Sequence, residues 1–356
     1  MLAPLAVLLI PASASAATKT VAAGPPLTKP PAGVPEYSDA TQFFRKTTTV
    51  NVGDTVSWKL FGFHTIYFPK KGGPNAYEGG DFLMTDPSRT YNETDPAGAP
   101  FWFNGQAQWI SKPAGVFPLG GKTENGSRIN ASGTPQGPPD KFSYKLKFTK
   151  AGTYTYFCTI HPHMQARIKV LRPGAPVPSA AADKQAVAKQ LAATIADLKS
   201  ADKRADAAGA VVEAGRDTNR FSLLHFFPAS KTVPVGTTVD FRMSSHTEEI
   251  HTVTFGSDAV LGKKGYAEKL SSAFFSPLPG TGKNGPPELG TPGALYFPSD
   301  QGALSFNGSQ HGGFLNAGLL GEKPLPSHSQ VTFTTPGTYK YQCLVHPEMR
   351  AQIVVQ

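Results

Sequence analysis

The sequence lacks several features that would place it in a common protein class. Only two cysteines occur among its 356 residues, which excludes a disulfide framework. Charged residues make up 17% of the chain, and no run of Lys and Arg exceeds two, so the net charge of +9 does not indicate a nucleic-acid surface. A diffusely basic surface instead favours acidic partners or anionic polymers of the cell envelope. Beyond the N-terminal run, no segment is long and apolar enough to span a bilayer, so we predict no transmembrane segment.

The N-terminal residues follow the sequence pattern of an export signal. Residues 1–10 form a short apolar run, and small residues follow up to position 17, although a basic start is missing. We therefore predict a signal peptide over 1–17 and an exported protein of the periplasm, the cell envelope or the extracellular space. Residues 18–36 are rich in Pro, Gly, Ala and Lys without periodicity, which predicts a flexible tether.

Glycine and proline are abundant, with 36 and 33 residues, and with the low charge they favour a loop-rich all-β protein. β-prone segments bounded by turn residues recur in both halves of the chain. The halves align with an offset of 183 residues near Val52 and of 185 residues at Cys158. This near-constant offset indicates an internal duplication, so we predict one domain over 37–172 and a second over 220–356.

Residues 173–219 are expected to join the two domains. A Pro-rich stretch over 173–178 predicts a rigid break, and the following residues from Ser179 to about 208 are rich in Ala, Lys, Leu and Gln. Apolar residues there fall at steps of four, four and three, which predicts a helix that either docks against a domain or is a solvated spacer. Its apolar stripe consists of Val187, Leu191, Ile195 and Leu198.

Each half ends in a strand followed by the pattern Cys-x2-His-x2-Met. A strand that ends in a tight loop can direct these three side chains towards one point. Thiolate, imidazole and a weak axial thioether are the donors of an electron-transfer copper site. The two sets of residues are Cys158, His161 and Met164, and Cys343, His346 and Met349.

A fourth ligand, a second imidazole, has to come from upstream in each half. His64 shares one strand face with Ile66 and Phe68 by the period of two, and His251 lies on a similar apolar face that alternates with threonines. The spacing from upstream His to Cys is 94 residues in one half and 92 in the other. The predicted copper ligands are therefore His64, Cys158, His161 and Met164 in the first half, and His251, Cys343, His346 and Met349 in the second.

The strand before each cysteine indicates which way the thiol faces. Tyrosines alternate there with other residues, and in the second half the intervening residues are Lys340 and Gln342. We expect both of these polar side chains to face water, so Cys343 and the tyrosines face inward.

The last strand and loop of each half resemble those of the cupredoxins, the small blue copper proteins, and the Cys-x2-His-x2-Met spacing is similar to that of amicyanin. The strands near Val52 and His64 resemble cupredoxin strands as well. This resemblance implies an all-β fold of two tandem Greek-key β-sandwiches of eight strands, joined by the Pro-rich linker and the helix. It also implies a type 1 copper in each half and one-electron transfer through the exposed ring edges of His161 and His346.

Two long stretches, about 70–140 and 256–328, depart from the small members of that family. Both are rich in Gly and Pro and carry a Phe-Asn-Gly motif. Stretches of this length in a compact domain usually carry function or pack as a lid. Their role is unassigned at this stage.

The sequence thus predicts an exported copper protein with two type 1 centres that transfers single electrons between redox partner proteins and is not an enzyme. One alternative is a two-domain copper enzyme of the nitrite reductase kind, which needs a further copper. Another is a copper-buffering or copper-delivery protein, although the chain has only five Met. The five histidines outside the predicted sites are too few for the trinuclear cluster of multicopper oxidases. We expect surface or hydrogen-bonding roles for them, with His246 an alternative ligand; they are His163, His225, His246, His311 and His328.

Overall fold

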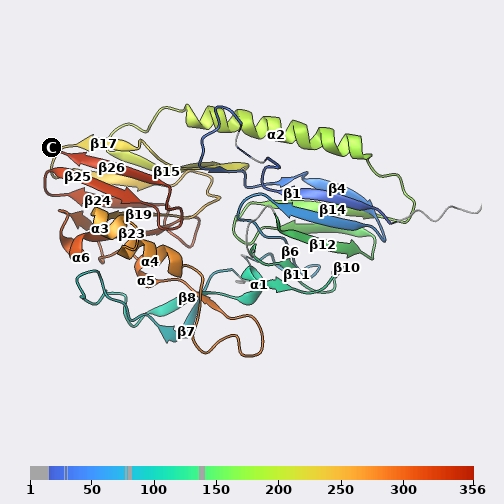
Figure 1. Ribbon diagram of the computed structural model, residues 1–356, viewed down its shortest axis with the longest axis horizontal. Helices are drawn as coiled ribbons and strands as arrows, with labels where there is room; N and C mark the ends of the chain where they lie inside the picture. The colour runs from blue at the N-terminus through green and yellow to red at the C-terminus, as the bar shows by residue number, and fades with distance from the viewer. Residues whose placement is uncertain (1–15, 28, 30, 77, 79–81, 136–140) are drawn as a thin grey trace, which may run out of the picture.

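The computed structural model describes residues 16–356 except 28, 30, 77, 79–81 and 136–140. The predicted signal peptide over 1–17 thus lies almost wholly outside the described residues. The fold is all-β, as predicted, and each half of the chain forms a pair of sheets (Figure 1). Apolar side chains pack between the two sheets of each pair. None of the helices in the described part of the chain has both the length and the apolar character that a membrane-crossing segment needs.

The first half contains a five-stranded and a six-stranded sheet. In spatial order the first sheet consists of β10 (Thr123–Glu124), β12 (Ser143–Phe148), β5 (Thr55–Leu60), β1 (Thr18–Ala23) and β3 (Phe43–Phe44). The second consists of β4 (Thr47–Asn51), β14 (Gln165–Leu171), β13 (Gly152–Phe157), β6 (Tyr67–Phe68), β11 (Asn130–Ser132) and β9 (Pro118–Leu119). Trp58 and Tyr156 are fully buried between these sheets and contact each other edge to face.

The second half repeats this arrangement with a six-stranded and a five-stranded sheet. One sheet consists of β2 (Ser38–Asp39), β16 (Phe221–Phe227), β15 (Val211–Thr218), β18 (Thr238–Arg242), β24 (His328–Phe333) and β22 (Leu304–Phe306). The other consists of β17 (Ser230–Val233), β26 (Arg350–Val355), β25 (Gly337–Gln342), β19 (His251–Gly256) and β23 (Phe314–Leu320). Phe241 and Tyr341 occupy the places of Trp58 and Tyr156 and are also in edge-to-face contact.

The duplication extends to the way in which the strands pair. β1 runs parallel to β5 in the first half, and β15 runs parallel to β18 in the second. At the far edge of each second sheet, β4 is parallel to β14 and β17 is parallel to β26. Each half therefore has more strands than the eight that the resemblance implied, because short strands from the long stretches are added to the sheet edges.

Two predictions about chain organisation are wrong. The expected flexible tether over 18–36 includes β1, which pairs along its whole length with Thr55–Leu60 and buries Val21 and Ala23. The expected linker over 173–219 includes β15, so the second sandwich begins before residue 220. Both strands lack a clear apolar alternation, and their pairing with distant strands stabilises them instead.

A short segment of the first half crosses to the second half. β2 pairs antiparallel with β16, with Asp39 opposite Ser222, and thereby extends a sheet of the second sandwich. The predicted domain over 37–172 therefore contributes a strand to its neighbour. The crossing strand β2 thus joins the two sandwiches through main-chain hydrogen bonds.

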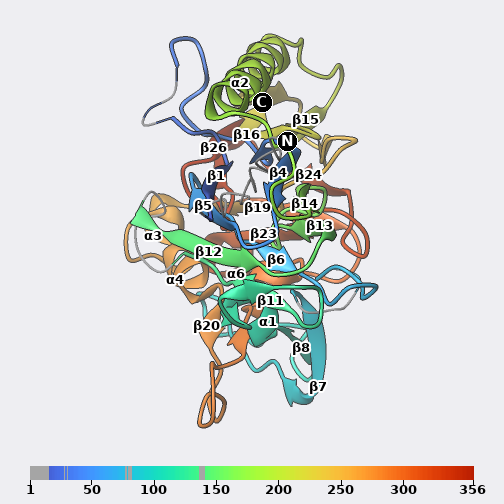
Figure 2. The ribbon, with the colours of Figure 1, turned by 90° about the vertical axis from the view of Figure 1, so that its right-hand side faces the viewer.

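The predicted helix is confirmed as α2 (Ala180–Asp202), and it docks against both halves rather than standing in solvent (Figures 1 and 2). Ser179 caps it by accepting a hydrogen bond from the amide of Ala182. Leu191 packs on the first sandwich, and Leu198 packs against Phe221 of the second.

The two long stretches pack against each other beside the second sandwich. β7 (Met84–Thr90) and β8 (Ala107–Ser111) from the first half form a sheet with β20 (Ser276–Pro277) and β21 (Leu289–Gly290) from the second. Phe103 lies in one apolar cluster with Leu295 and Phe314. The remaining short helices are α1 (Pro113–Val116), α3 (Asp258–Leu261), α4 (Tyr266–Ala273), α5 (Gly293–Tyr296) and α6 (Gln310–Gly313). The stretches are thus a packed connection between the halves.

This packing overturns two expectations about which side chains face water. The contrast between the apolar residues and the threonines of β19 predicted that the threonines face outward, but they are buried: α3 packs against this strand, and Thr254 Oγ1 donates to Asn316 Oδ1 of β23. Gln342, which was expected to be exposed, is only 3% exposed and lies beside Leu261 of α3. Lys340 does face solvent, where it pairs with Asp258.

Arg216 joins the end of α2 to the second sandwich and provides a test of the fold. Its guanidinium is buried and contacts Glu213, Asp206 and three main-chain carbonyl oxygens near the helix end. Arg216→Met removes these contacts, although Glu213 keeps its pair with Arg204, so we expect the free energy of unfolding, measured by urea denaturation, to fall by about 1–3 kcal/mol.

Arg220→Met is the matched control, because its ion pair with Asp197 is largely exposed. It should change the free energy of unfolding by at most about 1 kcal/mol. Equal losses in the two variants would contradict the role assigned to Arg216.

Candidate metal centres

The first candidate centre is formed where β13 ends. Cys158 follows this strand directly, and the chain then turns back into β14 through a short loop. The amide of Cys158 donates to the carbonyl of Met164 at 2.9 Å, and the amide of Met164 donates to the carbonyl of His161 at 3.1 Å. Pro162 follows His161 and restricts its backbone to extended conformations, which stiffens the loop.

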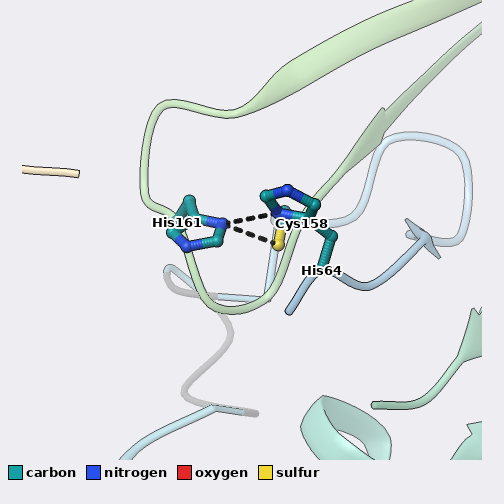
Figure 3. Close-up of side chains that lie close together, drawn as sticks. All are labelled: His64, Cys158 and His161. Carbon is teal, nitrogen blue, oxygen red and sulfur yellow. Dashed lines mark hydrogen bonds between the residues drawn. The ribbon is translucent and has the colours of Figure 1, made fainter. Parts of the chain in front are cut away.

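The sulfur and two ring nitrogens meet inside this loop (Figure 3). His161 Nδ1 lies 3.4 Å from Cys158 Sγ and 3.1 Å from His64 Nδ1. All three side chains are buried, with exposed fractions of 1% or less. The amide of Thr65 donates to Cys158 Sγ at 3.4 Å, so the residue after His64 also fixes the sulfur.

The second candidate centre repeats this geometry after β25. Cys343 Sγ lies 3.7 Å from His346 Nδ1 and 3.8 Å from His251 Nδ1, and the two Nδ1 atoms are 3.2 Å apart. The amide of Thr252 donates to the sulfur at 3.3 Å, as Thr65 does in the first half. The loop is closed by the same two main-chain hydrogen bonds, which involve Cys343, His346 and Met349.

The two predicted axial residues are buried beside these groups. Met164 lies in the same apolar cluster as Cys158, and Met349 lies in the same cluster as Cys343. Both are at most 1% exposed. The structure therefore brings one thiol and two imidazoles together in each half, with a buried methionine at the end of each loop.

The electrostatics favour the ionised thiol in both centres. Burial alone would raise the pKa of the Cys158 thiol, but the charge of His161 and the hydrogen bonds to His161 and His64 outweigh it and hold the pKa well below its ordinary value. In the second centre burial would again raise the pKa of the Cys343 thiol. The interactions with His251 and His346 outweigh burial and lower this pKa well below its ordinary value. A thiolate is the form of cysteine that binds metal.

The Nε2 atoms of three of these four histidines face carboxylates at the boundary between the halves. His64 Nε2 is 3.3 Å from Asp39, the residue on the crossing strand β2. His161 Nε2 is 2.8 Å from Glu249, and His346 Nε2 is 3.6 Å from the same carboxylate. The prediction of an exposed ring edge is therefore wrong for His161, because the second half covers it.

These carboxylates change the protonation of the histidines. Burial would lower the pKa of His64, but the charge of Asp39 outweighs it and raises the pKa to about 9. Glu249 likewise holds the pKa of His161 well above its ordinary value against the effect of burial. Sequence analysis missed Asp39 and Glu249; the only available signal was an acidic pair immediately before the apolar strand of His251.

The other histidines lie outside the two centres. His163 is 44% exposed and near Glu248, and His246 is an exposed loop residue, so it is not part of the His251 group. His311 contacts Asp95 and Asp300, His328 contacts Asp240, and the ring of His225 packs on Tyr37 and Phe227.

The donor sets fit copper. Each offers one thiolate and two imidazole nitrogens that converge from a strand end, a loop and a neighbouring segment, which is the combination of a blue copper site. The sulfur accepts main-chain hydrogen bonds in both centres, an arrangement that tunes such a site. The part of the chain described here has one further compact group of possible ligands, Asp39, His161 and Glu249, which shares His161 with the first centre.

Gly215 provides a test of the second centre, because it leaves no space for a side chain. A Cβ there would lie 2.7 Å from His251 Nε2, and the backbone has a φ of +81°. We expect Gly215→Ala to displace His251, weaken metal binding in this half and alter the absorption spectrum of the copper-loaded protein.

Gly236→Ala is the matched control, with a φ of +83° and no atom within 4 Å of the added Cβ. It should carry only the backbone strain, about 1–2 kcal/mol, and leave the spectrum unchanged. Identical spectra for both variants would mean that Gly215 does not position the histidine.

Comparison with known proteins finds similarity to solved structures over part of the chain. No family model and no curated protein match the chain. Among solved structures, a mutant plastocyanin of fern matches with 22% identity, 41% of this chain, 99% of its own and a TM-score of 0.22. An amicyanin mutant is 20% identical, and the match covers 37% of this chain and 74% of the amicyanin with a TM-score of 0.19. A purple cupredoxin from Nitrosopumilus maritimus is 16% identical, and the match covers 42% of this chain and 100% of the cupredoxin with a TM-score of 0.18.

Each match covers about two fifths of the chain, the size of one sandwich. The fold of this chain is assigned from its own structure: the paired sheets, the repeated strand order, and the loop in each half that is closed by hydrogen bonds between Cys, His and Met. The chain therefore has an all-β, cupredoxin-like fold, repeated in tandem.

Proposed function

We propose that this protein is an exported electron carrier with two type 1 copper centres. The observation that carries the proposal is the duplication of one buried thiol–imidazole–imidazole group, each closed by a loop that ends in methionine. Copper bound there would supply reversible one-electron oxidation and reduction. The proposed ligands are His64, Cys158, His161 and Met164 in the first half, and His251, Cys343, His346 and Met349 in the second.

The protein's own contribution is a buried, closely packed surrounding for the ligands. Cys158 and Cys343 lie at strand ends, and main-chain amides hold their sulfurs in place. Because the cavity is buried in close-packed sheets, the ligands have little freedom to move when the charge of the centre changes. Small ligand movement is the property that an electron carrier requires.

Two observations favour the carrier over its alternatives. A nitrite reductase of the two-domain kind needs a further copper, and the one additional ligand group among the described residues shares His161 and is mainly carboxylate. A delivery protein needs accessible donors, whereas the two thiols here are at most 1% exposed. Export, which the N-terminal residues predict, places the redox partner proteins outside the cytoplasm.

Copper content is the direct test of the two centres. We expect about two copper ions per wild-type chain with an intense blue colour that disappears on reduction, and about one in Cys158→Ser and in Cys343→Ser, since each change removes one thiolate. Metal analysis and visible absorption measure both. The two variants control for each other, because each leaves the other centre intact.

Five outcomes would contradict the carrier. A colourless copper-loaded protein or an unchanged copper count in either variant would remove the corresponding centre. Turnover of nitrite, or a second non-blue copper signal, would favour the enzyme. Rapid loss of copper to a competing chelator would favour buffering or delivery.

A further inference from the structure

One carboxylate lies between the loop histidines of the two halves. Glu249 Oε1 is 2.8 Å from His161 Nε2, and Glu249 Oε2 is 3.6 Å from His346 Nε2. The Nδ1 atoms of both rings point to their thiols, so the Nε2 atoms are the ends that remain for this contact. Glu249 thus links a proposed ligand of the first centre to a proposed ligand of the second.

The bridge is held from several sides. Glu249 is 7% exposed, and its amide and that of Glu248 donate to Asp217 Oδ2 at 3.3 and 3.0 Å. His251, a proposed ligand of the second centre, follows two residues later and begins β19. The crossing strand β2, helix α2 and the packed long stretches hold the halves together around it.

The fold by itself does not require this carboxylate. In the first half the residue two positions before the upstream histidine is Gly62, where a Cβ would lie 3.1 Å from His64 Nε2 and from Asp39. The first sandwich therefore forms its centre without a glutamate at this position.

An ion bridge is also a costly way to join two domains. Burying a carboxylate requires desolvation that its partners only partly offset, and apolar contacts hold domains at lower cost. The halves already share a strand pairing and an apolar cluster. The position of Glu249 between the two centres therefore points to a role in linking them.

We propose that Glu249 is an internal relay through which the two centres exchange single electrons. The inference rests on the proposed function. One centre loses one electron and the other gains it, so no proton or co-reactant is consumed. The carboxylate keeps its hydrogen bond with His161 and its ion-pair contact with His346 throughout. The path runs through the ring of His161, the carboxylate and the ring of His346.

The test follows the redistribution of electrons after partial reduction. In a Met349→Gln background, the altered axial residue separates the two centres in potential and absorption. After a pulse of reductant, electrons redistribute between the two centres. Because this transfer is intramolecular, the rate of this relaxation should be independent of protein concentration. Glu249→Gln loses one of the two acceptor oxygens, so we expect this relaxation to slow by about tenfold or more.

Glu322→Gln is the charge-matched control. It removes a carboxylate that is 46% exposed and faces His163, which is neither a proposed ligand nor part of the bridge. Its relaxation should stay within about threefold of the parent. A relaxation that depends on protein concentration in the parent, or an unchanged rate in Glu249→Gln, would overturn the relay.

A copper-free measurement keeps the inference apart from the proposed function. In the metal-free protein the ring N–H protons of His161 and His346 should exchange slowly with water by NMR, and faster in Glu249→Gln. Rapid exchange in the wild-type protein would overturn the bridge. Absence of blue colour in the copper-loaded parent would instead refute the copper centres, while the NMR measurement would still decide whether the bridge exists.

Discussion

The structure depends on ionisable groups that are buried together and compensate one another. The two thiols and the imidazoles of His64, His161 and His251 are buried, His346 is 14% exposed, and each thiol is stabilised as a thiolate by the histidines beside it. Those histidines in turn face carboxylates of the boundary, with Glu249 between His161 and His346. Removing one member leaves a buried charge without a partner, so the site and the boundary between the halves form one electrostatic unit.

The remainder of the fold keeps that unit closed. The strand β2 leaves the first half to pair in a sheet of the second and brings Asp39 to His64. Helix α2 contacts both sandwiches, and the long stretches meet in a cluster around Phe103. These three connections use main-chain hydrogen bonds, a helix and apolar packing, and all three restrict movement between the halves. In a molecule of two similar domains, such rigidity is not expected by default.

The sequence allowed prediction of those site residues that are marked by a local pattern of neighbouring residues. The spacing Cys-x2-His-x2-Met, its repetition and the upstream histidines on apolar segments predict the residues that the structure brings together in two groups. Pairing between distant segments left no such signal. Nothing in residues 18–23 marks them as a strand, and Asp39 and Glu249 gain their importance only through a boundary that forms in three dimensions. Gln342 was misplaced for the same reason, since the long stretch that covers it carries no periodic pattern.

The burial of His161 against the second half has a consequence for encounters between molecules. A carrier whose ring edge lies at the surface can pass its electron to any oxidant or to another copy of itself on collision. Here that edge is insulated, and an outside protein has to approach from another side. An open groove beside the loop of the first centre is lined by Lys46, Arg167, His246 and Met164. If the protein is the proposed carrier, the basic residues of this groove would attract acidic partners and make the encounter sensitive to ionic strength.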